Sequence, residues 1–285
     1  MANEKVHPRT IPVLGMEAHR MPCACTIAGS DPSGGAGIQS DLKTFTSIGV
    51  WGLTVVTAVT SQNSNTVKGI WIVPEDSIRM QIQTLFEDFE ISAYKTGMLP
   101  DRDSVAAAAW GIPEDAVLVV DPVIMSSAGR PLMDMDALEE LKSVLVPRAT
   151  LVTPNLGEAE VLSEMGQIST IDEMREAGLT ILDTGPEYVL VKGGHLQGCD
   201  AVDLLIGRDQ EFLLSGKRYP VDPHGTGCCL SAAVTAYLAL GQPVPSACKS
   251  AKEFIGSAIE AAVKGKTGNY LINPVPVAND KKTGL

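Results

Sequence analysis

A helix start near residue 225 carries the strongest chemical signal in the sequence. Residues 222–229 read DPHGTGCC and open an apolar segment that we expect to be helical to residue 240. Small residues in the first turn of a helix leave the backbone N–H groups unshielded, and the helix dipole adds partial positive charge there. Gly225, Thr226 and Gly227 therefore predict an anion hole that could stabilise a transferring phosphoryl group.

Cys228 lies in the same turn as the expected anion hole. A thiol at a helix N-terminus has its ionised form favoured, so Cys228 could accept the proton of a substrate hydroxyl. The alternative is structural: a glycine cap followed by two buried thiols, Cys228 and Cys229. The motif alone leaves both interpretations open.

Three charged residues lie near the ends of other expected strands. Lys192 ends a strand and is followed by two glycines, which would let its ammonium reach a phosphate as a point charge. Asp121 directly follows a strand, and Glu158 lies in the first turn of a helix that begins after Asn155. Carboxylates and water suit magnesium, so Glu158 could be an outer ligand of hydrated Mg²⁺, and Asp121 is a second carboxylate at the same edge of the sheet. A solvated lysine and an ordinary capping interaction between Asn155 and Glu158 are the simpler alternatives.

Gln62 lies two residues after the second expected strand, 53–60. Its side chain offers one acceptor and two donors in a plane, a pattern that suits the edge of a heteroaromatic amide or amidine. Asn63 and Asn65 beside it are also ordinary turn residues, so the segment could equally be a plain turn.

The glycine-rich segment 29–37, GSDPSGGAG, does not match the common nucleotide-binding patterns. A dinucleotide fingerprint would need a small residue at the end of GAGIQS, and the second strand lacks a terminal acidic residue. Neither Gly-Lys pair has the spacing of a Walker A loop. These departures argue against NAD binding and against a Walker-type phosphate site. The segment 29–37 could also be only a tight turn that contacts no ligand.

Alternating strands and helices must position these groups. Apolar runs bounded by turn residues alternate with segments of helical periodicity, which predicts an α/β fold: a mostly parallel central sheet flanked by helices on both faces. In such sheets ligands bind at the carboxyl ends of the strands, where these polar loops fall. The expected strands are 23–28, 53–60, 67–73, 92–95, 116–120, 150–152, 188–191, 201–206 and 211–214. The expected helices are 38–48, 74–89, 101–110, 134–145, 155–165, 171–183, 225–240 and 243–263.

Composition limits the classes of protein to which the chain can belong. It has 285 residues with 22 Lys+Arg against 34 Asp+Glu, a net charge of −12. We divide it into a poorly ordered leader (1–20), one domain (21–273) and a tail (274–285). The acidic balance, with no basic cluster, argues against nucleic acid, and no apolar run is long enough to span a membrane. The leader lacks an apolar signal segment and the 6 cysteines lack CxxC spacing, so we expect a cytoplasmic protein.

Several short segments, taken in order along the chain, carry a resemblance to a known family. They are AGSDPSGGAGIQ (28–39), DLKTF (41–45), QN (62–63), KTGML (95–99), DPV (121–123), TPNL (153–156), KGGH (192–195) and HGTGC (224–228). Together they resemble the hydroxymethylpyrimidine/phosphomethylpyrimidine kinases of thiamine synthesis, which belong to the ribokinase superfamily. The resemblance extends over nearly the whole expected domain.

The resemblance implies a ribokinase-like fold with a minimal lid and a two-step reaction with ATP and Mg²⁺. The first step phosphorylates the 5-hydroxymethyl group of 4-amino-5-hydroxymethyl-2-methylpyrimidine, and the second converts the monophosphate to the diphosphate. By the match, Gln62 hydrogen-bonds the pyrimidine, Gly29 and Asp41 lie in the same pocket, and Met98 and Val123 pack on the ring. The family also implies a homodimer.

The same match assigns the chemistry at the other end of the pocket. The sugar kinases of the superfamily carry Asp where this chain has Cys228, and a thiol in water has an unperturbed pKa of about 8.5. The segment 264–270 is only loosely similar to the family's nucleotide-side loop, so the adenine contacts are left unassigned. The implied roles are an anion hole at Gly225, Thr226 and Gly227, a phosphate contact at Lys192, magnesium through water at Asp121 and Glu158, and a base at Cys228.

Two other functions remain open at this stage. One is a pyridoxal kinase of the same superfamily, against which Gln62 and the DPSGGAG loop favour the pyrimidine. The other is a regulatory protein that binds the pyrimidine without turnover, but such a protein would not need Lys192, Asp121 and Glu158. We further expect 67–73 and 201–214 to form a partial lid, because both follow ligand-bearing loops.

Overall fold

The structure is a computed structural model that describes residues 21–275 except 127–128, 195, 197 and 199. The expected leader and most of the expected tail lie outside the described residues. The strands are β1 (Cys23–Ser30), β2 (Trp51–Gln62), β3 (Val67–Ile72), β4 (Ile91–Thr96), β5 (Leu118–Val120), β6 (Leu151–Val152), β7 (Tyr188–Gly193), β8 (Asp200–Gly207), β9 (Gln210–Lys217), β10 (Val263–Lys264) and β11 (Tyr270–Leu271). The helices are α1 (Gly37–Ile48), α2 (Glu75–Phe86), α3 (Arg102–Gly111), α4 (Met135–Glu140), α5 (Leu156–Ser163), α6 (Ile171–Leu182), α7 (Thr226–Ala239) and α8 (Val244–Glu260), with a π-helical turn η1 (Leu141–Leu145) and a 3₁₀ turn η2 (Val146–Arg148) after α4.

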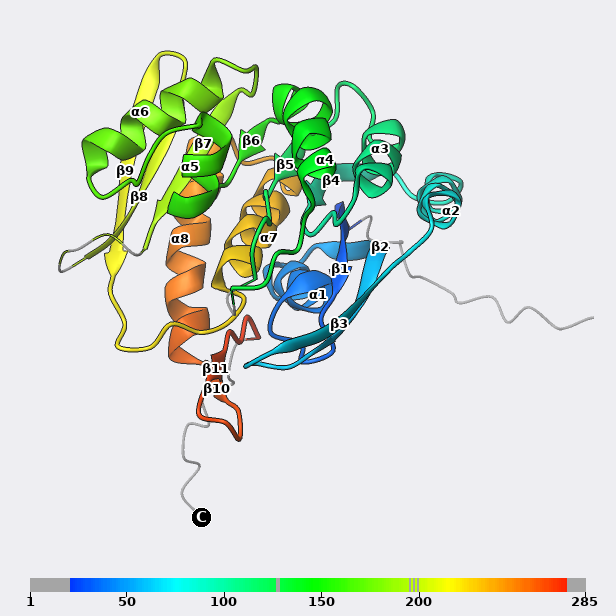
Figure 1. Cartoon of the computed structure of the whole chain (residues 1–285), viewed down its shortest axis with the longest axis horizontal. Helices are drawn as coiled ribbons and strands as arrows, with labels where there is room; N and C mark the ends of the chain where they lie inside the picture. The colour runs from blue at the N-terminus through cyan, green and yellow to red at the C-terminus, as the bar shows by residue number, and fades with distance from the viewer. Residues whose placement is uncertain (1–20, 127–128, 195, 197, 199, 276–285) are drawn as a thin grey trace, which may run out of the picture.

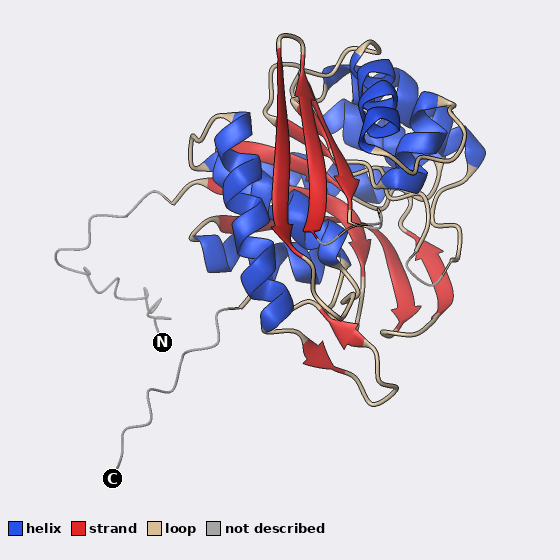
Figure 2. Cartoon of the chain, turned by 90° about the vertical axis from the view of Figure 1, so that its left-hand side faces the viewer, coloured by secondary structure: helices blue, strands red, loops and turns tan. Residues whose placement is uncertain are grey.

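Within the described part of the chain, nine strands form one sheet in the order β3-β2-β1-β4-β5-β6-β7-β8-β9. The strands from β2 to β7 run parallel, while β3 at one edge and the hairpin β8–β9 at the other edge are antiparallel. Figure 2 shows the strands as a twisted layer with helices on both sides. The mostly parallel α/β fold is therefore confirmed, and all the parallel strands direct their carboxyl ends to one edge.

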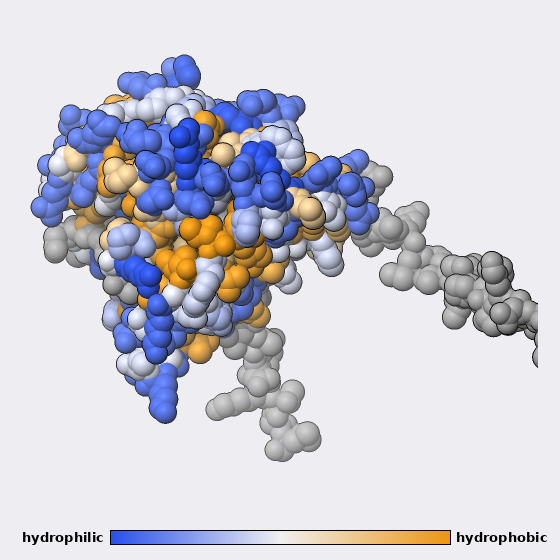
Figure 3. Space-filling model, turned by 45° about the vertical axis from the view of Figure 1, so that its right-hand side comes forward, coloured by the Kyte–Doolittle hydropathy of each residue, from blue (hydrophilic) through white to orange (hydrophobic). Residues whose placement is uncertain are grey.

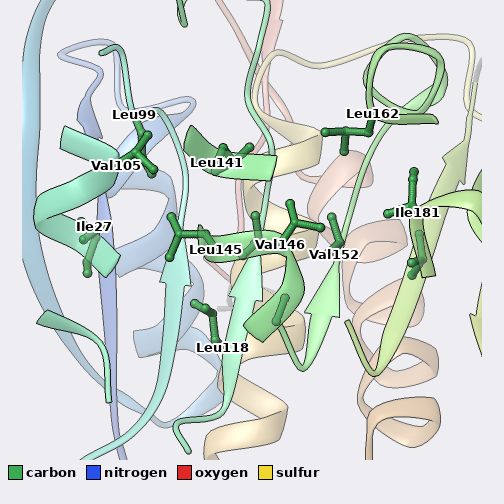
Figure 4. Close-up of a cluster of buried hydrophobic side chains, with 14 of the residues drawn as sticks. Ile27, Leu99, Val105, Leu118, Leu141, Leu145, Val146, Val152, Leu162 and Ile181 are labelled. Carbon is green, nitrogen blue, oxygen red and sulfur yellow. The ribbon is translucent and has the colours of Figure 1, made fainter. Parts of the chain in front are cut away.

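Hydrophobic cores cover both faces of this sheet. One core packs α2 to α6 against the sheet, and a second packs α7 and α8 against the opposite face (Figure 1). A third, smaller core includes Phe45 of α1 and Ala232 of α7. Because side chains alternate along a strand, Leu118 and Val120 of β5 belong to the first core while Val119 belongs to the second. Figure 4 shows the first core, in which Leu145, Val152 and other apolar side chains pack together.

The central helix α7 is buried on nearly all sides, as expected of a helix that is apolar all round. It packs between α1 and α8 and also contacts β1, β4 and β5. Many of its buried residues are small, such as Ala232, Ala233 and Ala236, so the neighbouring elements can approach closely. This packing fixes the direction in which the N-terminus of α7 points.

The expected strands and helices within 21–275 are all present, with differences at their ends. The last expected helix, 243–263, ends earlier, and Val263 instead begins the small pair β10–β11, which the sequence did not predict. Asn269, in the turn of that pair, donates a hydrogen bond to the carbonyl oxygen of Ser64, which ties the pair to the loop after β2. No helix of the described residues is long and apolar enough to cross a membrane.

Candidate active site

A pocket opens at the carboxyl ends of β1, β2, β4, β5 and β7. Ten of the twelve residues that the sequence analysis singled out line it: Gly29, Gln62, Met98, Asp121, Val123, Glu158, Lys192, Gly225, Gly227 and Cys228. Other residues of the wall, to which the sequence analysis gave no role, include Asp31, Lys95 and His224. Polar groups from the ends of these strands, from the segment after β6 and from the start of α7 therefore meet in one pocket.

The N-terminus of α7 forms one end of the pocket wall. Gly225 has a φ of 91°, and a Cβ at this position would lie 1.7 Å from the carbonyl oxygen of Gly35, so only glycine fits. Thr226 is not part of the pocket wall, and its hydroxyl donates a hydrogen bond of 2.7 Å to the carbonyl oxygen of Pro223. The first backbone N–H groups of a helix have no partner within the helix and are available to an anion.

Lys192 lies between two carboxylates beside this helix start. Its Nζ is 3.0 Å from Oδ1 of Asp121 and 3.9 Å from Oε2 of Glu158. A Cβ on Gly227 would lie 3.4 Å from the same Nζ, which places the ammonium next to the expected anion hole. The cluster therefore combines one cation and two carboxylates at the phosphate end of the pocket.

The two carboxylates of this cluster differ in their protonation. Burial opposes ionisation of Asp121, but Lys192 and further donors lower its pKa. Thr153 Oγ1 and Ser231 Oγ donate to its two oxygens, at 3.2 and 2.9 Å. Burial raises the pKa of Glu158 to about 7, with Lys192 opposing this shift. Asp121 is thus the permanent carboxylate, while Glu158 titrates near neutral pH.

The capping interaction considered for Asn155 and Glu158 is present. The side chain of Asn155 accepts a hydrogen bond of 2.9 Å from the backbone N–H of Glu158, and Glu158 Oε2 accepts one of 2.8 Å from the N–H of Asn155. Glu158 nevertheless also lines the pocket. The structural and the functional interpretation of this residue are therefore compatible.

Cys228 lines the pocket, but its ionisation differs from the expectation. Burial raises the pKa of its thiol to about 12, although the Lys95 ammonium opposes the shift. The prediction that the helix N-terminus favours the thiolate is therefore wrong for the free protein, because desolvation outweighs it. Cys229 is fully buried and lies 3.4 Å from the hydroxyl of Thr44, so its role is structural.

At the other end of the pocket, Gln62 contacts His224, which in turn contacts Asp31; the sequence analysis assigned neither His224 nor Asp31. The Nε2 of Gln62 lies 3.0 Å from Nε2 of His224, which lies 3.1 Å from Oδ2 of Asp31. Burial opposes ionisation of Asp31, but hydrogen bonds from His224 and Ser33 lower its pKa. One ring nitrogen cannot donate to a carboxylate and accept from an amide at once, so the tautomer of His224 decides which of these two hydrogen bonds forms.

Asp41 and Lys95 correct the assignment that the resemblance suggested. Asp41 does not line the pocket: it is fully buried, and its Oδ2 accepts hydrogen bonds from Thr26 Oγ1 at 2.6 Å and Lys95 Nζ at 3.2 Å. Lys95, at the end of β4, lies between Asp41 and the pocket. Like Lys192, Lys95 is a lysine at the end of a strand with a glycine shortly after it, in this case Gly97.

The donor set fits magnesium only in the manner expected for a nucleotide-bound ion. No group of three His, Cys, Asp or Glu side chains among residues 21–275, where described, could hold a metal. Asp121 and Glu158 nevertheless both line the pocket, and Mg²⁺ commonly binds one or two carboxylates together with waters and substrate phosphates. His195 of the KGGH segment lies outside the described residues.

The two expected lid segments differ in their relation to the pocket. Lys68 of β3 lies with Gln62 and Asn63 in the wall of a second cavity, which shares Gln62 with the pocket. In contrast, no residue of β8 or β9 lines either cavity, because this hairpin extends the sheet at its far edge. This arrangement gives no support to a lid at 201–214, which stays a prediction.

Comparison with known proteins gives a consistent result. The family model described as phosphomethylpyrimidine kinase matches residues 31–273. The hydroxymethylpyrimidine/phosphomethylpyrimidine kinase of Streptomyces coelicolor is 44% identical over 242 residues, which cover 84% of this chain and 89% of that protein. The structure of a phosphomethylpyrimidine kinase from Clostridium difficile 630 is similar with a TM-score of 0.73 and 41% identity, over 83% of this chain and 98% of that one. A pyridoxal kinase from Staphylococcus aureus, solved with AMP-PCP and pyridoxal, gives a TM-score of 0.83 and 33% identity, over 91% and 96% of the two chains.

Proposed function

This chain belongs to the phosphomethylpyrimidine kinase family, and from that premise we propose that it uses MgATP to phosphorylate 4-amino-5-hydroxymethyl-2-methylpyrimidine and then the resulting monophosphate. The observation that carries the proposal is the convergence of two kinds of group in one pocket. The start of α7 and Lys192 lie at one end, and Gln62 lies at the other. A phosphoryl donor and a heteroaromatic acceptor thus find separate partners at the two ends of the same pocket.

The acceptor is held by one polar and several apolar contacts. Gln62 pairs with the polar edge of the pyrimidine, and His224 Nε2 lies 3.0 Å from the amide nitrogen of Gln62. Met98 and Val123, both in the pocket wall, pack on the ring. Aligning the hydroxyl with the donor phosphate in this way makes the transfer effectively unimolecular.

Phosphoryl transfer relies on electrostatic groups that are already in place. The acceptor oxygen forms a bond to the γ-phosphorus while the bond to the leaving oxygen of ADP breaks. The backbone N–H groups at the start of α7 and the ammonium of Lys192 stabilise the charge on the transferred group. Asp121 and Glu158 would hold Mg²⁺ through water, and that ion would neutralise charge on the nucleotide phosphates.

Cys228 accepts the proton of the acceptor hydroxyl in the first reaction, and only its thiolate can do so. Because burial raises the pKa of Cys228 to about 12, the thiolate is a minor form near neutral pH. Its fraction grows as the pH rises, so kcat of the first phosphorylation should increase from about pH 7 to about pH 9. A flat profile in steady-state kinetics would remove Cys228 as the base.

The direct test is ADP release from MgATP that depends on the aminopyrimidine alcohol. In Cys228→Ala, kcat should fall about 10²-fold or more, because a general base contributes on that order. Cys23→Ala is a matched control, because Cys23 begins β1 at the end of the strand away from the pocket. Pyrimidine binding in a calorimeter without any ADP release would instead favour the non-catalytic binding protein.

Pyridoxal kinase is the second candidate, and the similarity to the pyridoxal-bound kinase of Staphylococcus aureus favours it. Both substrates are heteroaromatic rings with a hydroxymethyl group. A parallel assay decides between them: the proposal requires the larger kcat/KM for the aminopyrimidine, and a larger value for pyridoxal would reverse the assignment.

We also propose a homodimer in the cytoplasm. Figure 3 shows that apolar residues gather on one face of the molecule. Strands β2 and β3 expose several large apolar side chains, among them Trp51, Trp71 and Ile72. Exposed apolar surface of this kind is a feature of interfaces between proteins. Light scattering on the purified protein measures its mass, and a monomer at micromolar concentration would contradict this proposal.

A further inference from the structure

Lys95 places a second buried cation in the wall of the pocket. Its side chain is almost completely buried, yet it borders the cavity beside Cys228. Within the described residues its Nζ has one acceptor at hydrogen-bond distance, Oδ2 of Asp41 at 3.2 Å. An ammonium carries three N–H donors, so donors remain for a group that enters the pocket. Burial opposes the charge, but the carboxylates of Asp41 and Asp121 raise the pKa of Lys95, and it stays protonated.

The two cations of the pocket, Lys192 and Lys95, have different neighbours. Lys192 lies beside Gly227 at the start of α7, where the donor phosphate is expected, and it is paired with Asp121. Lys95 lies beside Gly97, since a Cβ there would be only 3.0 Å from its Nζ. Met98 follows directly and is one of the residues that pack on the acceptor ring. Lys95 is therefore the cation on the acceptor side.

The two acceptors of the proposed function make different demands on this side of the pocket. The first acceptor is a neutral alcohol, whose oxygen must lose a proton. The second is a phosphate monoester, with a second pKa of about 6, so near neutral pH it carries close to two negative charges. Its attacking oxygen needs no base, but its charge needs a cation in a pocket that also contains Asp31 and Asp121.

We propose that Lys95 binds the phosphate of the monophosphate acceptor, so that the second phosphorylation depends on Lys95 more than the first does. This inference rests on the proposed function. In the second transfer an oxygen of the acceptor phosphate forms a bond to the γ-phosphorus of ATP. The bond to the oxygen of ADP breaks, ADP leaves with the electron pair, and no proton is transferred. Cys228 is therefore needed mainly in the first reaction and Lys95 mainly in the second.

The test is a crossed comparison of two variants on two acceptors. In Lys95→Met, kcat/KM for the monophosphate should fall about 100-fold, because the acceptor phosphate loses its direct contact with the ammonium. For the alcohol, kcat/KM should fall about tenfold or less, because the alcohol makes no such contact. In Cys228→Ser the order should reverse. Lys252→Met is a matched control, because Lys252 forms a 2.6 Å ion pair with Asp203 outside the pocket wall. It should leave the ratio of the two kcat/KM values unchanged.

The outcomes separate the inference from the proposed function. Lys95→Arg keeps the charge and should restore the ratio to within about threefold of the wild type. If Lys95→Met does not fold, Lys95→Gln replaces it, since its amide can still donate to Asp41. Equal losses on the two acceptors in the folded variant would overturn the inference. Wild-type protein that phosphorylates neither acceptor would overturn the proposed function itself.

Discussion

Lys192 and Lys95 have similar sequence contexts, but the ion pairs that they form with Asp121 and Asp41 lie in different surroundings. Each lysine is at the end of a parallel strand and faces one aspartate, at 3.0 and 3.2 Å. The side chain of Lys192 is 12% exposed and both members of its pair line the pocket. That of Lys95 is 1% exposed, and its aspartate lies behind the pocket wall. The same local pattern therefore gives one pair that lies open to the pocket and one pair in which only the lysine reaches the pocket wall while its aspartate is enclosed by the fold.

The largest effect is expected when Lys192 is removed. Lys192→Met should lower kcat for both phosphorylations about 10³-fold, because the transferred group loses its cation and Asp121 loses its counter-charge. Steady-state assays with each acceptor measure this. An equal loss on both acceptors would fit the donor-side role, whereas a loss confined to one acceptor would break the contrast with Lys95.

A change in stability should distinguish the two aspartates. Asp41→Asn leaves the fully buried Lys95 without its carboxylate and should lower the free energy of unfolding by about 3 kcal/mol. Asp121→Asn should lower it less, because Lys192 keeps Glu158 and borders the open pocket. Urea unfolding followed by circular dichroism gives both values. Equal destabilisation in the two variants would mean that burial does not separate the pairs.

A smaller effect is expected from a single methyl group beside Lys95. In Gly97→Ala the new Cβ would lie 3.0 Å from Nζ of Lys95 and 2.9 Å from Cβ of Ala28, so the ammonium must shift. We expect kcat/KM for the monophosphate to fall about tenfold more than that for the alcohol. Gly194→Ala is the control, because a Cβ there would meet no atom within 4 Å. The same ratio of activities in both variants would show that the position of Lys95 is unimportant.

The fold followed from the sequence because its signals are local and repeated. Apolar strands alternate with helical periodicity along the domain, and a parallel sheet then brings the ends of β1, β2, β4, β5 and β7 to one edge. The pair β10–β11 was missed because each strand has only two residues, too few for any period to be visible. The hairpin β8–β9 was recognised, but its place at the far edge depends on long-range pairing.

The site could be predicted only to the level of its loops. The glycines of the α7 turn and Gln62 were found because strand ends and helix starts are visible in a sequence. The difference in burial between Lys95 and Lys192 could not be predicted, because the depth of each side chain depends on which other residues pack over it. The same reason explains Asp41, which a motif placed beside the substrate, and Cys228, whose ionisation depends on desolvation by the folded chain.

The contact between Gly225 and Gly35 has a consequence for how the two substrates bind. The start of α7 and the glycine-rich loop after β1 touch so closely that a Cβ on Gly225 would meet the Gly35 carbonyl at 1.7 Å. Neither segment can move without displacing the other. We therefore expect occupation of the nucleotide side to shift the acceptor side, so that the affinity for one substrate, measured by calorimetry, changes when the other is bound.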